Sequence, residues 1–144
     1  MRQIRICLVF MTLLVLVSCS VSTEFFIQNL TSSKQTVTIN FRKNKSADPD
    51  TVYDVHLDFK YENRISTPKE FSKSKRLITL EKTIVNDRIT IDIPAHAMLK
   101  IEKSDHFDWK SNVKSIEIND KQYSIEQLYH KAQKIKYNYI YKIE

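Results

Sequence analysis

The chain has 144 residues and a formal net charge of +6, which comes from 23 Lys and Arg against 17 Asp and Glu. The positive charge is spread along the chain. Its densest stretch, KEFSKSKR at 69–76, is interrupted by an acidic and an aromatic residue, so no nucleic-acid partner is expected. The absence of glycine excludes the P-loop, the dinucleotide-binding fingerprint and the Gly-x-Ser-x-Gly nucleophile elbow. Turns must therefore rely on Asn, Asp, Ser and Pro.

The N-terminus has the pattern of a secretory signal. Arg2 and Arg5 precede an apolar stretch, Ile6 to Val17, which is shorter than the roughly 20 residues that a membrane-spanning helix needs. Basic residues before such a stretch and small residues after it are typical of a signal peptide, so residues 1–18 are expected to be removed. The alternative, a core helix of the mature domain, would need a polar face that this stretch lacks.

The end of this signal, LVSC at residues 16–19, resembles the lipobox of bacterial lipoproteins. The resemblance implies cleavage before Cys19 and acylation of that residue with fatty acids such as palmitate. It also implies that the protein is anchored by lipid to a membrane of the bacterial cell envelope. Ser20 is not acidic, which resembles the pattern that permits transport to the outer membrane.

Processing at this point divides the chain into a tether and one domain. Residues 19–23 would form the lipidated Cys and a short tether, and residues 24–144 a single β-rich domain of ordinary length. Because Cys7 would leave with the signal and Cys19 would carry lipid, neither an intramolecular disulfide nor a thiolate metal site is expected.

Three strands are predicted in the first half of the domain. They lie at 24–30, 36–42 and 52–61, and the last alternates without error. Its apolar face consists of Tyr53, Val55, Leu57, Phe59 and Tyr61. The segment 62–76 that follows is polar and charged, and it is expected to be a long loop with a potential binding role.

Two Asn-Asp pairs predict tight hairpins in the second half. Asn86-Asp87 separates strands at 77–85 and 88–93, and Asn119-Asp120 turns the segment 113–124 back on itself. Asn and Asp are the best substitutes for glycine in a two-residue hairpin turn.

One helix and a final strand are predicted at the C-terminal end. Ser124 and Gln127 fit a capping box, and apolar residues recur at helical spacing over 125–134. Residues 135–143 then alternate as a strand. One face of it carries Ile135, Tyr137, Tyr139, Tyr141 and Ile143.

About eight short strands without β-α-β alternation predict a mainly β fold. We expect an antiparallel, immunoglobulin-like β-sandwich with one late C-terminal helix followed by a final strand. The segment IDIPAHAMLKIE, in which a strand near 97–102 follows an interruption at Pro94, resembles the late strands of immunoglobulin-like modules.

Two groups of carboxylates and histidines are candidates for chemistry. The segment 54–58 places two aspartates and a histidine on one strand face, where two of them could share a metal ion, and the segment 105–108 offers a His–Asp pair for acid–base work. An ordinary exposed sheet face and a polar loop explain these groups better, so we expect no metal, no cofactor and no catalytic residue. His96 and His130 are expected to be structural.

Aromatic side chains are the candidates for ligand binding. Tyr137, Tyr139 and Tyr141 in register would form a flat surface for sugar rings or for the apolar patch of a partner. Phe107 and Trp109 lie beside carboxylates, which also suits sugar binding. The alternative is that the tyrosines pack beneath the helix and that Phe107 and Trp109 close the end of the sandwich.

The sequence therefore favours a small, non-catalytic envelope lipoprotein that binds an envelope protein or glycan or has a structural role. One alternative is a periplasmic inhibitor or immunity-type protein, which a charged surface around 62–76 would favour, whereas exposed coplanar aromatics would favour a glycan. The other is a hydrolase, which would need the side chains of 54–58 and 105–108 to converge in one cleft.

Overall fold

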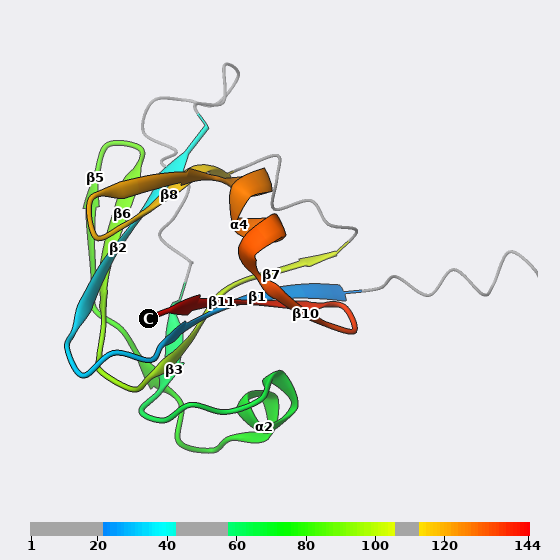
Figure 1. Cartoon of the computed structure of the whole chain (residues 1–144). Coiled ribbons are helices and arrows are strands. Elements are labelled where there is room, and N and C mark those ends of the chain that lie inside the picture. Colours follow the sequence, from blue (N-terminus) through cyan, green and yellow to red (C-terminus); the bar gives the residue numbers. More distant parts are fainter. Residues whose placement is uncertain (1–21, 43–57, 106–112) are drawn as a thin grey trace, which may run out of the picture.

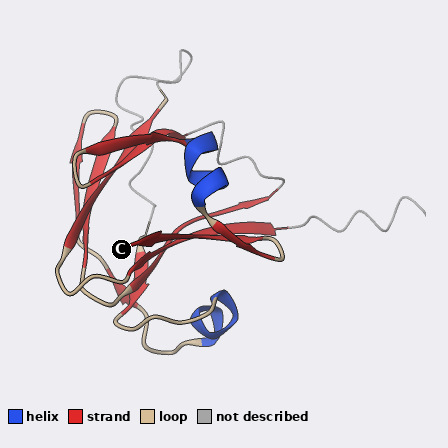
Figure 2. Cartoon of the chain, viewed as in Figure 1, coloured by secondary structure: helices blue, strands red, loops and turns tan. Residues whose placement is uncertain are grey.

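The computed structural model describes residues 22–42, 58–105 and 113–144, which form a mainly β fold of eleven strands in two sheets with two short helices (Figures 1 and 2). The six strands of sheet A are, in spatial order, β10 (Gln133–Ile135), β11 (Asn138–Ile143), β1 (Ser22–Asn29), β7 (Met98–Asp105), β3 (Lys60–Glu62) and β4 (Ile78–Thr79). The five strands of sheet B are β5 (Lys82–Val85), β6 (Arg88–Ile93), β2 (Gln35–Phe41), β8 (Val113–Ile118) and β9 (Lys121–Ser124). The helices are α2 (Pro68–Lys73) and α4 (Ile125–Lys131).

The inner faces of the two sheets enclose one hydrophobic core. Phe25, Ile27 and Leu99 of sheet A pack in the same cluster as Ile39 and Ile91 of sheet B, and each of these side chains is at most 1% exposed. Alternate residues of the inner strands supply this core, as a pleated sheet with one buried face requires. The prediction of a mainly β fold made of two sheets is confirmed.

The first strand lies inside sheet A. β1 pairs with β7 in the antiparallel sense and with β11 in the parallel sense, so the expectation of a wholly antiparallel sandwich is wrong for this pair. The chain leaves sheet B through α4, forms β10 at the edge of sheet A and turns back into β11. After this turn β11 runs in the same direction as β1, so the two strands pair in the parallel sense. β1 also begins at Ser22, so Ser22 and Thr23 belong to the sheet and not to the expected tether.

Both predicted hairpin turns are confirmed. Asn86 has a φ of 56°, and Val85 pairs with Arg88 across the first turn. Asn119 and Asp120 have φ values of 49° and 61° in the second turn. In the second turn, two successive residues with positive φ give a twist that matches that of the flanking strands, whereas in the first turn only Asn86 has a positive φ.

The segment 77–85 is not one strand as predicted. β4 pairs with β3 in sheet A, and β5 pairs with β6 in sheet B. The chain crosses from one sheet to the other at Leu80 and Glu81, a position that carries no proline and no turn-forming pair.

The segment 62–76 is not the long loop that its polarity predicts, because it contains α2. The Thr67 hydroxyl accepts the backbone NH of Glu70, and the Glu70 carboxylate accepts the backbone NH of Thr67 at 2.8 Å. Pro68 occupies the first helical turn, where it costs no hydrogen bond. Phe71 is 1% exposed and packs edge-on against Phe26 of β1, with ring centroids 5.4 Å apart.

The helix at the C-terminal end is confirmed but shorter than predicted. The capping box of Ser124 and Gln127 is present, and α4 ends at Lys131 because Ala132 is extended. The single strand expected at 135–143 is instead the end of β10, a turn with Lys136 at a φ of 56°, and β11.

The other predicted strands fall close to observed ones. Those at 24–30, 36–42, 88–93 and 97–102 correspond to β1, β2, β6 and β7. Of the strand predicted at 52–61, the described part contains only the start of β3, with Phe59 buried just before it, and residues 52–57 lie outside the described residues.

The turn between β6 and β7 offers a test of backbone strain in a chain without glycine. His96 is exposed there at a φ of 52°, a conformation that disfavours any residue with a Cβ atom. We predict that His96→Gly raises the free energy of unfolding by about 0.5–1 kcal/mol in urea denaturation. His130, exposed on α4, is the matched control: His130→Gly should lower it by about 0.5 kcal/mol. A loss of stability in both variants would contradict the assigned conformation of His96.

Candidate functional site

The structure describes only part of the predicted site. Cys19, Phe107 and Trp109 lie outside the described residues, as do the histidines at 56 and 106. Of the predicted ligand-binding tyrosines, Tyr137, Tyr139 and Tyr141 are all described, so the aromatic stripe can be examined directly.

The three tyrosines do not form one stripe. Tyr137 is 52% exposed in the turn between β10 and β11, whereas Tyr139 and Tyr141 are half-buried on the inner face of β11 and pack against the core. The alternative in which the tyrosines pack beneath the helix therefore holds for Tyr139, which contacts Tyr129 of α4, whereas Tyr141 packs against Tyr123 of β9. The period of two predicted a continuous strand because neither Lys136 nor Tyr137 is a residue typical of turns.

Tyr139 and Tyr141 belong to a cluster where α4 bridges the two sheets. The ring centroids of Tyr139 and of Tyr129 on α4 are 4.2 Å apart, and the two ring planes are inclined at 83°. The ring centroids of Tyr141 and of Tyr123 on β9 are 5.8 Å apart, and their planes are inclined at 54°. Rings inclined in this way pack well against each other. They do not form the coplanar platform on which sugar rings would stack.

Two lysines cover this tyrosine cluster on its outer side. The ammonium of Lys131 lies 4.9 Å from the ring centroid of Tyr123, and that of Lys134 lies 5.6 Å from the ring centroid of Tyr139. Both distances allow cation–π attraction. Burial, together with the hydrogen bond and charge of Tyr123, raises the pKa of Tyr141 to about 12. The phenol of Tyr141 is therefore neutral at physiological pH, where the cluster closes the edge of the sandwich.

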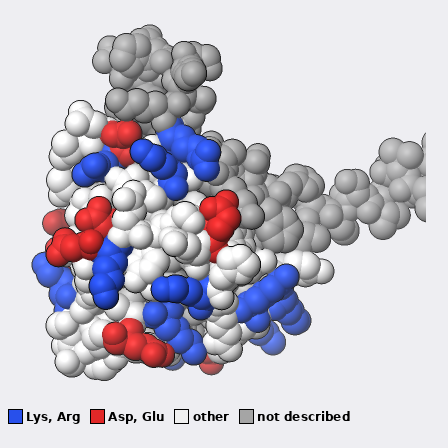
Figure 3. All heavy atoms as spheres, turned by 45° about the horizontal axis from the view of Figure 1, so that its top comes forward, with Lys and Arg blue, Asp and Glu red and all other residues white. Residues whose placement is uncertain are grey.

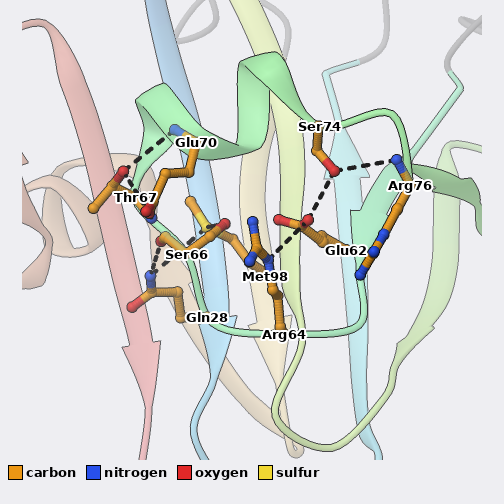
Figure 4. Close-up of polar contacts among 9 residues, drawn as sticks. All are labelled: Gln28, Glu62, Arg64, Ser66, Thr67, Glu70, Ser74, Arg76 and Met98. Atoms are coloured by element: carbon orange, nitrogen blue, oxygen red, sulfur yellow. Dashed lines mark hydrogen bonds and ion pairs between the residues drawn. The ribbon is translucent and has the colours of Figure 1, made fainter.

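A second cluster fixes the α2 segment to the outer face of sheet A (Figure 4). The Glu62 carboxylate, at the end of β3, is 3% exposed and accepts hydrogen bonds from the Ser74 hydroxyl at 2.7 Å and from Arg64 Nε at 2.9 Å. Gln28 Nε2 of β1 donates to the Ser66 carbonyl at 2.9 Å. The Ser66 hydroxyl lies 3.4 Å from Met98 Sδ. We call these six residues the anchor cluster.

The Glu62 carboxyl is the ionised centre of the anchor cluster. Burial raises its pKa, but the hydrogen bonds from Ser74 and Arg64, the nearby Ser66 hydroxyl and the positive charge of Arg64 together outweigh burial, so the pKa lies below its ordinary value. The carboxylate lies outside the main hydrophobic core, beneath the segment that carries α2.

The surface that the anchor cluster supports is basic. Exposed cationic side chains on it are Arg64, Lys69, Lys73, Lys75 and Arg76. Glu70 is the exposed acidic residue between them, and it is engaged with Thr67. Ile65 and Ile78, near the two ends of the segment, are 39% and 48% exposed. We call this the α2 surface, and the sequence signal for it was the charge-rich run at 62–76.

The described acidic and histidine residues are scattered. Asp58 is exposed before β3, His96 occupies a turn, and His130 lies on the exposed side of α4. Within the described ranges, no group of three or more His, Cys, Asp or Glu is arranged to hold a metal ion. Neither of the two described helices is long and apolar enough to cross a membrane.

Comparison with known proteins identifies no relative. Family models, curated proteins and solved structures each give no match to this chain. The assignment of a function therefore depends on the residues and their geometry.

The low pKa of Glu62 gives a pH-dependence of stability with a defined sign. A carboxyl whose pKa is lower in the folded than in the unfolded state contributes stability above its unfolded pKa, and this contribution is lost as the pH falls through the folded pKa. We predict that Glu62→Gln lowers the free energy of unfolding by about 1–2 kcal/mol at pH 7. In the variant, the free energy of unfolding should also fall less steeply than in the wild type as the pH is lowered below about 5. Urea denaturation at several pH values measures both effects.

The control for this experiment is Glu81→Gln, because Glu81 is exposed before β5. Its substitution should change stability little at any pH. Parallel pH profiles for wild type and Glu62→Gln would show that the carboxylate of Glu62 does not hold the α2 segment.

Proposed function

We propose that this protein is a bacterial envelope lipoprotein, anchored through acylated Cys19, whose β-sandwich is a non-catalytic module that binds a protein partner. The proposal extends to the immunoglobulin-like class of sandwich, supported by mostly antiparallel sheets between which the chain crosses repeatedly. It includes residence in the outer membrane, on the basis of Ser20.

The observation that supports the anchor is the position of the first strand relative to the lipobox-like motif. LVSC ends at Cys19, and β1 begins at Ser22 as an interior strand of sheet A. Removal of residues 1–18 would thus leave every strand of the described fold intact. A signal and cleavage point that end just before a domain are what an exported protein requires.

The tyrosine cluster and the α2 surface together favour a protein over a glycan as the partner. The half-buried tyrosines are inclined to one another and offer no stacking platform. The α2 surface is exposed, basic and rigidly attached, and it has apolar side chains near both ends. Interfaces between proteins commonly combine apolar contacts with Arg, and positive charge favours an acidic partner. This observation also favours the inhibitor or immunity-type alternative, which differs only in the partner.

The anchor is tested by the intact mass of the membrane-extracted protein beside that of Cys19→Ala. The wild type should have lost residues 1–18, should carry the added mass of fatty acyl chains, and should sediment with membranes. Cys19→Ala should lack the acyl mass and should largely leave the membrane fraction, because acyl chains supply most of the membrane affinity. A wild-type mass without acyl chains would refute the anchor.

The binding surface is tested by charge reversal. Lys69→Glu combined with Lys73→Glu should reduce crosslinking of the protein to its envelope partner by tenfold or more, since close opposite charges across an interface contribute about 1.4 kcal/mol or more. Lys114→Glu combined with Lys121→Glu on sheet B makes the same change in net charge and should leave crosslinking unchanged. An equal loss in both double variants would show that net charge, and not the α2 surface, governs the interaction.

A further inference from the structure

One end of the sandwich combines the start of β1 with an exposed aromatic and basic turn. Glu24 of β1 pairs with Asn138 of β11 in parallel register, so Lys136 and Tyr137 lie about level with Ser22 and Thr23 on the neighbouring strand. Tyr137 is 52% exposed, and Ile135 beside it is 37% exposed. We call residues 134–137 the β10–β11 tip. It lies at the right-hand end of the molecule in Figure 1, where β1 begins.

The length of the chain restricts how far this tip can be from Cys19. Ser22 follows Cys19 by three positions, and a fully extended chain spans at most about 3.6 Å per residue, so the acylated residue is within about 11 Å of the sheet. Neighbouring strands are only about 5 Å apart. With an acyl anchor at Cys19, the tip must therefore lie close to the bilayer surface.

The charge of this region suits an anionic membrane. Residues 127–143 contain four lysines and no acidic residue, and Lys134 and Lys136 belong to the tip. On β1, the strand next to β11, the acidic residue is Glu24, and its carboxylate forms an ion pair with Lys100 at 3.6 Å. Figure 3 shows Lys and Arg side chains grouped at this right-hand end of the described surface.

From this juxtaposition we propose that the β10–β11 tip contacts the headgroup region of the membrane that holds acylated Cys19, and so fixes the orientation of the domain. Tyr137 supplies an amphipathic ring of the kind that is enriched at membrane interfaces, Ile135 supplies apolar surface, and Lys134 and Lys136 attract anionic lipid. This inference rests on the proposed acylation. Fatty acyl chains and a basic patch are complementary signals for stable membrane attachment.

The test places a probe on the tip of the processed, membrane-extracted protein. Acylated Cys19 has no free thiol and Cys7 leaves with the signal, so Tyr137→Cys offers a single site for an environment-sensitive fluorophore. Val85→Cys, at the end of β5, is the matched control, because Val85 is 58% exposed and β5 and β6 lie on the opposite side of the molecule (Figure 1). Both proteins are reconstituted in vesicles of phosphatidylethanolamine and phosphatidylglycerol that contain a nitroxide-labelled lipid.

The expected result is quenching at position 137 that is several-fold stronger than at position 85. The difference should shrink when Lys134 and Lys136 are both replaced by Glu, or when salt is raised to 1 M, which shortens the Debye length to about 3 Å. Should Tyr137→Cys fold poorly, Ile135→Cys provides the second probe position.

The outcomes separate this inference from the proposed function. Acylated protein with equal quenching at positions 137 and 85 would overturn the contact of the tip and leave the anchor intact. Protein whose intact mass shows no acyl chains would overturn the anchor, and the proposed orientation with it.

Discussion

The fold depends on the burial of β1 between β7 and β11. Phe25 and Ile27 project into the main core, and Phe26 projects to the opposite face beneath Phe71, so both faces of the strand are covered. Both edges are hydrogen-bonded as well. A strand that is enclosed on four sides cannot leave without opening the core and the outer cluster together. The middle of β1, residues 25–28, is thus held in the sheet on both edges and both faces.

The two helices cover different parts of the sandwich: α4 closes one edge, and α2 covers one outer face. α4 bridges the sheets, where Tyr123, Tyr129, Tyr139 and Tyr141 close the edge of the core. α2 covers the outer face of sheet A, where the Glu62 carboxylate fixes its flanking segment. The basic α2 surface is consequently displaced from the end at which β1 begins (Figure 1). A domain oriented by the β10–β11 tip would leave that surface accessible to a partner.

The sequence predicts the elements whose local chemistry is distinctive. The turns at Asn86-Asp87 and Asn119-Asp120 were found because these residues tolerate positive φ, and α4 was found because Ser124 and Gln127 form a capping box. α2 carries an equally good signal in Thr67, Pro68 and Glu70, which the polarity of the surrounding residues obscured.

Other features have no local signature. The turn at Lys136 lacks a turn-forming pair, so alternation alone predicted a continuous strand and a continuous tyrosine stripe. The parallel pairing of β1 with β11 joins the two ends of the domain, and periodicity within a segment cannot specify such a partner. The basic character of the α2 surface was visible in the sequence, but the contacts of Glu62 with Ser74 and Arg64 that hold it depend on tertiary structure.

The most direct test of this account is amide hydrogen exchange along β1. Since residues 25–28 are paired with β7 and β11 on their two edges and are buried, their hydrogen-bonded amides should exchange only through global unfolding, as slowly as those of the paired part of β11. Exchange of β1 amides far ahead of the amides of β2 and β6 in sheet B would show that the N-terminal strand frays from the sheet. It would then be part of the tether, and neither the enclosed strand nor the upper limit on the distance from Cys19 to the β10–β11 tip would stand.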